Sequence, residues 1–276
     1  MAAPTTAFSK GTLDCPVLSV KNLVGQIYLM RMHCPAIAQQ VLPGQFINIK
    51  VNNEFIPFLR KPFSVCRREA QKGWIEVVWK IVGKGTQIMA NDHAGESIHV
   101  LGPLGKGYRI DSGLRHALLV AGGLGVAPLP FLCEELLKHR KPVEIFLGAK
   151  SRCELSFVEE FQEMGVQVSV ATEDGSVGKK GLVTELLTER LAQHPALKNG
   201  TFFGCGPAGL LNRMTQISEE LKMECQIAIE TMMGCGFGIC VGCPVRVRNP
   251  QAGENPYKLT CVDGPVFDAR EVLLDG

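Results

Sequence analysis

The first part of the chain consists of short runs in which apolar and polar residues alternate. Five runs rich in β-branched and aromatic residues are bounded by Gly, Pro or Asn. We expect them to be strands, at Leu13–Lys21, Ile27–His33, Gln45–Lys50, Trp74–Val82 and Ser97–Leu101. Because no long helical pattern interrupts them, a small antiparallel β-barrel is the closure they favour, and we place it over residues 10–112.

The pattern then changes to apolar strands that alternate with amphipathic helices. Strands are expected at His116–Ala121, Val143–Gly148, Val166–Ala171 and Thr201–Cys205. Helices are expected at Pro130–Leu137, Phe157–Met164, Thr184–Gln193 and Ala208–Lys222. This alternation is typical of a doubly wound, parallel α/β domain, which we place over residues 113–225. Such a domain binds ligands at the carboxyl ends of its strands.

The last segment, residues 226–276, contains short strand-like runs around a cysteine-rich loop. About fifty residues bury little apolar surface, so a unit of this size needs further stabilisation, such as a bound metal group. The sequence therefore predicts three units: a barrel, an α/β domain and a small C-terminal module.

Composition narrows the functional classes. The formal charge of +2 over 276 residues gives no basis for binding nucleic acid. The sequence has no apolar run long enough for a membrane span, and its first residues lack the apolar core of a signal peptide. Eleven cysteines, an odd number, favour a reducing, cytoplasmic setting with metal use over a disulfide scaffold. Six of them are expected to be packing residues: Cys15, Cys34, Cys66, Cys133, Cys153 and Cys225.

The strongest chemical signal is the spacing of the other cysteines. Cys235, Cys240 and Cys243 have a C-x4-C-x2-C spacing, and Cys261 follows on a later segment. Plant-type [2Fe–2S] clusters are held in this way, by soft thiolate ligands. Glycines between the cysteines let the backbone wrap closely round a cluster: Gly234, Gly236, Gly238 and Gly242. A structural zinc site and unconnected core cysteines are the alternatives, but zinc sites usually show two separate close pairs.

Two segments of the predicted barrel carry candidate anion-binding residues. One is the run Arg60-Lys61-Pro62-Phe63-Ser64-Val65, which on its own also suits a basic edge segment. The other runs from Val78 into a glycine turn and a helix that starts near Thr86. A glycine turn before a helix N-terminus is a phosphate site, although Thr86 is equally suited to be a plain helix cap.

In the α/β domain, glycine turns follow two of the strands. The first holds Gly122, Gly123 and Gly125, and the second is Cys205-Gly206-Pro207. The first turn lacks the full G-x-G-x-x-G fingerprint, so a nucleotide site and a turn without a ligand both remain open.

Together these motifs resemble those of the iron–sulfur, FAD-containing electron-transfer subunits of type B dihydroorotate dehydrogenase, within the ferredoxin reductase superfamily. The resemblance implies that an R-P-x-S motif, here Lys61–Ser64 preceded by Arg60, meets FAD. It assigns FAD binding also to Val78, Trp79, Lys80, Gly85 and Thr86. It assigns the pyridine nucleotide to Gly122, Gly123, Gly125, Cys205, Gly206 and Pro207, and the cluster to the four cysteines. Lys61 stands where the family has arginine, which grips a pyrophosphate bidentately, so either Arg60 takes over or the flavin is held less tightly.

The resemblance further implies an electron relay. Electrons would pass between NAD and an FMN-containing catalytic subunit through FAD and the cluster, in a heterotetramer, with net flow from dihydroorotate to NAD. Because the cofactors carry the chemistry, no catalytic acid, base or nucleophile is expected in this chain.

The alternatives are an NAD(P)H:acceptor reductase, a subunit of another redox complex, and a zinc-stapled regulatory protein. NADP would require contacts near Lys150–Arg152. Ile239 and Val241, on either side of Cys240, are expected either to dock a partner or to pack inward.

Overall fold

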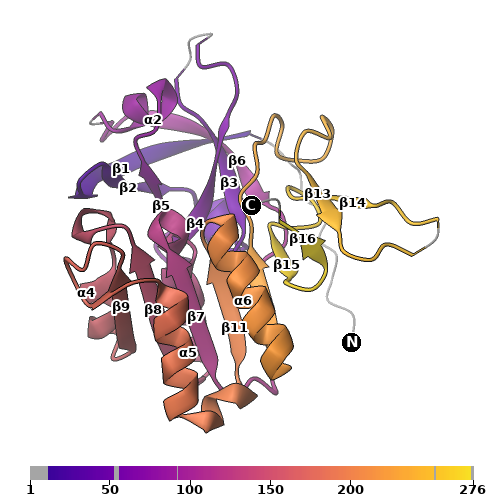
Figure 1. The fold of residues 1–276 in the computed structure, drawn as a ribbon. Helices are drawn as coiled ribbons and strands as arrows, with labels where there is room; N and C mark the ends of the chain where they lie inside the picture. The colour runs from indigo at the N-terminus through magenta and orange to yellow at the C-terminus, as the bar shows by residue number, and fades with distance from the viewer. Residues whose placement is uncertain (1–11, 53–55, 92, 252, 275–276) are drawn as a thin grey trace.

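The computed structural model describes residues 12–52, 56–91, 93–251 and 253–274. Residues 10 and 11, at the start of the predicted barrel, lie outside this range. Figure 1 shows a barrel at the top, a twisted sheet with helices below it, and a small C-terminal unit beside the barrel. The structure confirms the predicted fold class: an antiparallel barrel, a doubly wound α/β domain and a small module that carries the cysteine loop.

The barrel is closed by six antiparallel strands in the order β1-β2-β5-β4-β3-β6. Their bounds are β1 Thr12–Val24, β2 Ile27–His33, β3 Phe46–Lys50, β4 Lys61–Glu69, β5 Trp74–Lys80 and β6 Ser97–Leu104. Two short helices, α1 (Pro35–Ala38) and α2 (Lys84–Met89), lie in the connections. The sequence analysis missed β4, because its proline and charges obscure the strand pattern.

Strand β3 shows the period-2 alternation with both faces covered. Ile47 and Ile49 point into the barrel core and are fully buried. Phe46 and Asn48 point to the other face, yet they too are buried, with 2% and 1% of their surface exposed. A barrel strand normally turns alternate residues to solvent, so something outside the barrel covers this face. The C-terminal module provides that cover.

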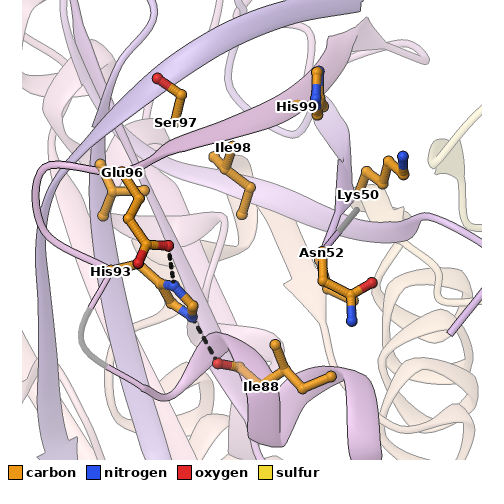
Figure 2. Close-up of a pocket in the computed structure, with 10 residues that line it drawn as sticks. Lys50, Asn52, Ile88, His93, Glu96, Ser97, Ile98 and His99 are labelled. Carbon is orange, nitrogen blue, oxygen red and sulfur yellow. Dashed lines mark hydrogen bonds and ion pairs between the residues drawn. The ribbon is translucent and has the colours of Figure 1, made fainter. Parts of the chain in front are cut away.

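One end of the barrel holds a small cavity of about 190 Å³ that no sequence motif predicted. His93 projects into it, with one ring nitrogen 2.8 Å from Glu96 Oε2 and the other 2.8 Å from the Ile88 carbonyl (Figure 2). Because both ring nitrogens of His93 already face acceptors, this histidine ties the β6 turn to helix α2.

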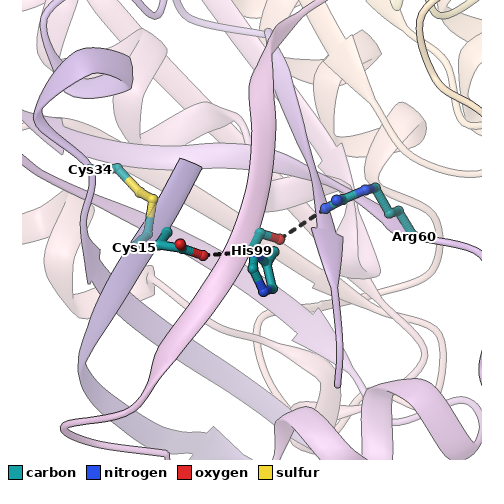
Figure 3. The surroundings of a disulfide bond; sticks show 5 residues. Cys15, Cys34, Arg60 and His99 are labelled. Atoms are coloured by element: carbon teal, nitrogen blue, oxygen red, sulfur yellow. Dashed lines mark hydrogen bonds and ion pairs between the residues drawn. A yellow bond between two sulfur atoms is a disulfide. The ribbon is translucent and has the colours of Figure 1, made fainter. Parts of the chain in front are cut away.

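Two cysteines expected to be packing residues are joined in the structure. Cys15 on β1 and Cys34, just after β2, form a buried disulfide (Figure 3). The expectation for this pair was wrong, because a separation of 19 residues carries no signal that strand pairing brings the two sulfurs together. The other four packing candidates are free: Cys66, Cys133 and Cys225 are buried as expected, whereas Cys153 is exposed.

The α/β domain is built on a sheet in the order β10-β9-β8-β7-β11-β12-β15, parallel from β10 to β12. The strand bounds are β7 Ala117–Gly122, β8 Val143–Ala149, β9 Gln167–Thr172, β10 Lys179–Lys180, β11 Thr201–Cys205 and β12 Glu224–Ala228. The α-helices are α3 Leu129–Lys138, α4 Val158–Glu163, α5 Val183–Gln193 and α6 Ala208–Leu221, with 3₁₀ turns at Gly123–Val126, Arg152–Glu154 and Pro195–Asn199. Helices α3 and α4 pack on one face of the sheet, and α5 and α6 on the other.

The C-terminal module has its own three-stranded sheet, β14 (Tyr257–Leu259), β13 (Pro244–Val247) and β16 (Val272–Leu273). Its strand β15 (Val266–Asp268) instead pairs antiparallel with β12 in the large sheet. Strand β12 also runs across the predicted limit between residues 225 and 226. The module and the α/β domain therefore share a sheet, and the domain limits stay a prediction. Within the described residues, the structure has no helix long and apolar enough to span a membrane.

The barrel and the α/β domain are joined by buried polar contacts. The Tyr108 hydroxyl donates to the Gly204 carbonyl at 3.0 Å. The Gln226 side chain accepts from the Arg109 backbone N–H at 2.8 Å and donates to the Arg109 carbonyl at 2.9 Å. Because buried polar groups are costly to leave unpaired, these contacts fix the end of the barrel against strands β11 and β12.

Candidate functional site

The four candidate cluster cysteines lie in two pairs. In the first pair, the Cys235 N–H is 3.4 Å from Cys240 Sγ, and the Cys240 N–H is 3.4 Å from Cys235 Sγ. In the second pair, the Cys243 and Cys261 sulfurs are 3.2 Å apart. Within the described chain, no three His, Cys, Asp or Glu side chains are grouped tightly enough to hold one metal ion. A two-and-two arrangement suits a cluster with two irons, each of which takes two thiolates.

Backbone N–H groups on the loop already point at the sulfurs. The Phe237 N–H points at Cys235 Sγ, and the Gly242 N–H points at Cys240 Sγ. Partial desolvation raises the pKa of Cys235, but N–H groups of Cys240 and Phe237 outweigh it and lower this pKa to about 6. These N–H groups would likewise stabilise a thiolate bound to iron, so the loop fits a cluster.

The glycines of the loop have separate roles. Gly236 and Gly238 have φ angles of +81° and +94°, a region that side chains disfavour. Gly236 also lies against the Asn48 amide, where a Cβ would come within 2.0 Å of Nδ2. The Asn48 amide donates to the Cys235 carbonyl at 2.8 Å, so the barrel itself holds the start of the loop.

A cavity of about 300 Å³ opens between the barrel, the α/β domain and the cluster module. It brings together seven of the residues assigned to FAD: Pro62, Phe63, Ser64, Val78, Trp79, Lys80 and Thr86. Thr86 is not the helix cap but the third residue of α2, and its hydroxyl accepts from the N–H groups of Val82 and Gly83. Trp79 donates its indole N–H to the Thr86 carbonyl, so strand and helix hold one wall of the cavity together.

Arg60 and Lys61 lie on opposite sides of their segment. The Lys61 side chain packs along Gly85, where a Cβ would come within 3.1 Å of the Lys61 Cε. Arg60 turns away and donates to the His99 carbonyl at 3.0 Å (Figure 3). Partial burial lowers the pKa of Arg60. The structure therefore brings Lys61 and Gly85 together beside the flavin cavity and does not bring Arg60 there.

The flavin cavity also contains residues that the sequence analysis did not single out. Ile229, Glu230, Thr231 and Met233 come from the segment before the cysteine loop. Burial raises the pKa of Glu230, which lies at the carboxyl end of the large sheet. The sequence held a signal, since this segment leads directly into the cluster motif, but its approach to the flavin cavity depends on the tertiary fold.

A second cavity, of about 600 Å³, lies at the carboxyl ends of the parallel strands. Gly122, Gly123 and Pro207 line it, as the sequence analysis expected of nucleotide-binding residues. It also contains residues that the analysis did not assign, among them Glu154, Glu173 and Arg213. Leu124 and Ala127, close to the same glycine turn, line the flavin cavity, so residues from one turn border both cavities.

Gly125 and Cys205 pack against each other beneath this cavity. A Cβ on Gly125 would lie 2.3 Å from the Cys205 carbonyl oxygen, so glycine is needed for the two turns to approach each other. Cys205 is buried, and burial raises its pKa. Gly206 lines a neighbouring cavity between the α/β domain and the cluster module. The structure thus places Gly125 and Cys205 under the cavity wall and not in it.

Comparison with known proteins agrees with this geometry. The protein-family model for the iron–sulfur cluster binding domain of dihydroorotate dehydrogenase B matches residues 230–273. Oxidoreductase FAD-binding and NAD-binding domain models match residues 14–108 and 119–216. The electron transfer subunit of dihydroorotate dehydrogenase B (NAD(+)) from Geobacillus sp. is 36% identical over 94% of this chain and 97% of its own length. The subunit of the same name from Desulforamulus reducens is 32% identical with the same coverage.

The chain belongs to the family of dihydroorotate dehydrogenase B (NAD(+)) electron transfer subunits. It therefore carries an iron–sulfur cluster binding domain, an FAD-binding domain and an NAD-binding domain. Among solved structures, the one titled for flavin-based electron bifurcation by the NADH-dependent reduced ferredoxin-NADP oxidoreductase superposes with a TM-score of 0.82 at 28% identity. The match covers 95% of this chain and 90% of that one. A ferredoxin reductase of carbazole 1,9a-dioxygenase, at 18% identity and a TM-score of 0.65, shares the fold.

The placement of Lys61 and Arg60 leads to a test of the phosphate contact. Lys61→Ala should weaken FAD retention by about 1.5–3 kcal/mol, the value of one charge-assisted contact. Arg60→Ala should change it far less, because Arg60 contacts His99. FAD released on dilution, followed by fluorescence, measures the difference. Equal losses in the two variants would contradict the assignment of the contact to Lys61.

Proposed function

We propose that this chain relays electrons between NAD(H) and an FMN-containing dihydroorotate dehydrogenase catalytic subunit, in a cytoplasmic heterotetramer. Apart from Arg60, which contacts His99, the residues assigned to FAD, NAD and the cluster in the preceding subsections are the residues we propose for this relay. The proposal rests most on one observation: Met233 lines the flavin cavity and also packs against the apolar cluster that contains Cys243 and Cys261. Flavin and cluster sites are thus neighbours within one chain. When bound, FAD supplies the exchange between two-electron hydride chemistry and one-electron transfer, and the cluster supplies a one-electron carrier.

The chain's own residues would bind and orient the carriers. The Gly122–Gly123 turn would hold the nucleotide pyrophosphate next to the flavin cavity, because glycine lets the backbone approach closely. The Trp79 and Thr86 wall would hold the flavin, and Lys61 its phosphate. The N–H groups of the cysteine loop would stabilise the bound thiolates.

The cluster module exposes an apolar surface where a partner subunit would bind. Ile239 and Val241 flank Cys240, the exposed member of the four candidate cluster cysteines, and 76% and 62% of their surfaces are accessible. Met232 and Val262 are also exposed, at 91% and 43%. The inward packing considered for Ile239 and Val241 does not occur. Exposed apolar side chains around a redox site mark an interaction surface, which supports docking of the catalytic subunit here.

The nucleotide cavity favours NAD over NADP. With the pyrophosphate at the glycine turn, the nicotinamide would point to the flavin cavity, and the adenosine half would extend toward the ends of β8 and β9. Glu173 follows β9 and lines that end of the cavity. A carboxylate there accepts hydrogen bonds from ribose hydroxyls and repels a 2′-phosphate. Lys150, whose positive charge would attract a 2′-phosphate, lines the same end of the cavity. The negative charge of Glu173 would therefore decide the preference for NAD.

A second candidate has support from the structural comparison. The match to the NADH-dependent reduced ferredoxin-NADP oxidoreductase structure, at 28% identity over nearly the whole chain, favours the flavin and iron–sulfur subunit of another redox complex. The two candidates differ in the partner that the cluster face accepts.

Reconstitution tests the proposal directly. The purified chain should contain FAD and about two irons and two sulfides. Alone it should oxidise NADH with artificial acceptors without turning over dihydroorotate. Addition of an FMN-containing dihydroorotate dehydrogenase subunit should give NAD-linked turnover of dihydroorotate. If the chain binds no such subunit but reduces ferredoxin efficiently, the second candidate replaces the first.

Ile239→Glu should impair this coupled turnover at least about tenfold, which corresponds to 1.4 kcal/mol of lost association energy. The charge would have to be desolvated in the interface. NADH oxidation with artificial acceptors and iron content should stay at wild-type values. Leu18→Glu, an exposed apolar position on β1 away from the module, is the matched control and should leave coupling intact. Equal loss in the two variants would argue against this docking face.

Glu173→Gln should lower the preference for NADH over NADPH at least about tenfold in kcat/KM, or 1.4 kcal/mol, because the repulsion of the 2′-phosphate is lost. Steady-state kinetics with each nucleotide and an artificial acceptor measure this ratio. Glu163→Gln, on the exposed surface of α4, serves as the control. A ratio that does not change in Glu173→Gln would remove this residue from the recognition of the ribose.

A further inference from the structure

We propose that the outer face of strand β3, formed by Phe46 and Asn48, positions the cluster against the flavin and sets the rate of electron transfer between them. This inference rests on the proposed relay function. It concerns a step inside the chain, whereas docking of the catalytic subunit concerns the opposite, exposed side of the cluster loop.

The first observation is the pattern of β3 itself. In the run Phe46-Ile47-Asn48-Ile49, the two isoleucines fill the barrel core. Phe46 and Asn48 face the cluster module, and both are buried there. An asparagine that faced solvent on a barrel strand would need no partner. Here the amide is buried beneath the cysteine loop, so it serves the junction between the two units.

The second observation is the contact that Asn48 makes. Its Nδ2 donates to the Cys235 carbonyl at 2.8 Å, across 187 residues of sequence. Gly236 lies directly on the amide, with no room for a Cβ. Within the described residues, the Asn48 Oδ1 atom is buried without a hydrogen-bond partner. The orientation of the amide is therefore decided by the cysteine loop, since a flipped amide would set two oxygens against each other. Asn48 thus fixes the backbone that carries the first cluster cysteine.

The third observation is the position of Phe46. Phe46 lines the flavin cavity and belongs to the same buried apolar cluster as Cys243 and Cys261. Met233 also lines the flavin cavity and packs against this cluster. Phe46 and Met233 therefore form an apolar partition between the two cofactor sites, which would limit the access of water between them. The apolar shell and the hydrogen bonds around a cluster control its potential and its solvent access.

The step concerned is the passage of one electron from reduced flavin to oxidised cluster, or the reverse. No atom or bond moves through the partition. The chain therefore contributes only the distance between the cofactors, the rigidity of their surroundings and the exclusion of water. Phe46 and Asn48, on the outer face of one barrel strand, control all three. Phe46 and Asn48 are positioning residues in this sense, and neither carries the charge itself.

The test uses the full-length chain with FAD and cluster bound. The variants are Phe46→Ala, the milder Phe46→Leu and Asn48→Ala. Ile47→Val is the matched control, because it trims the residue between them on the core side of the same strand. Laser-flash reduction introduces single electrons and follows their redistribution between flavin and cluster, so hydride transfer does not mask the rate. The EPR spectrum of the reduced cluster and the FAD, iron and sulfide contents are measured in parallel.

We expect electron redistribution to be at least tenfold slower in Phe46→Ala and in Asn48→Ala, and within twofold of wild type in Ile47→Val. The EPR spectrum of Asn48→Ala should change, because the loop that carries Cys235 loses its anchor. If Phe46→Ala loses a cofactor, Phe46→Leu decides, with an expected slowing of at least threefold.

Wild-type rates and spectra in fully loaded Asn48→Ala and Phe46→Leu would overturn the proposal. Equal slowing in Ile47→Val would also overturn it, because general barrel packing would then set the rate. A wild-type chain without iron, sulfide or FAD would instead refute the relay function itself.

Discussion

Three residue pairs between β12 and β15 hold the cluster module to the large sheet: Gln226 with Asp268, Ile227 with Phe267, and Ala228 with Val266. The module is too small to fold round its own core, so its position must come from its neighbours. The strand pairing sets one side of the module, and the Asn48 contact from the barrel sets the other. Between these two attachments lie the cysteine loop and the flavin cavity. The closeness of the two cofactor sites therefore depends on a sheet that the module shares with the α/β domain.

The sequence predicted most strands and helices to within a few residues, because their apolar patterns are strong. The exceptions have physical causes. Strand β4 begins with Lys61 and Pro62, residues that resemble a loop until a closed barrel pairs Pro62 with Asn48. The pairing of β15 with β12 was not predicted, because a three-residue strand has no pattern of its own and its partner is distant in sequence. The Cys15–Cys34 disulfide depends on the spatial approach of two strand ends and has no local signal.

The candidate site likewise has features that the sequence predicted and features that depend on the tertiary fold. The cysteine spacing and the glycine turns predicted which segments would meet, since these residue types are tied to one backbone conformation or one ligand chemistry. The side on which each residue lies could not be predicted. Arg60 and Lys61 are neighbours with the same charge, yet one contacts a β6 carbonyl and the other packs on Gly85. Gly123 lines the cavity, whereas Gly125, two residues later, is glycine because the Cys205 carbonyl presses against it.

The flavin cavity has one junction with the nucleotide cavity and another with the cluster module. The two junctions differ in the way that their chemistry requires. Toward the nucleotide, Lys80 of the flavin cavity and Glu154 of the nucleotide cavity form an ion pair at 2.6 Å. This pair is partly exposed, and such pairs contribute little stability, so breaking it would cost little free energy. Toward the cluster, the junction is the buried Asn48 amide and the Phe46–Met233 partition. Hydride transfer needs a ligand that arrives and leaves in close contact, whereas single-electron transfer needs a fixed and dry separation. A weak polar contact on one side and a buried, packed one on the other meet these two needs within one chain.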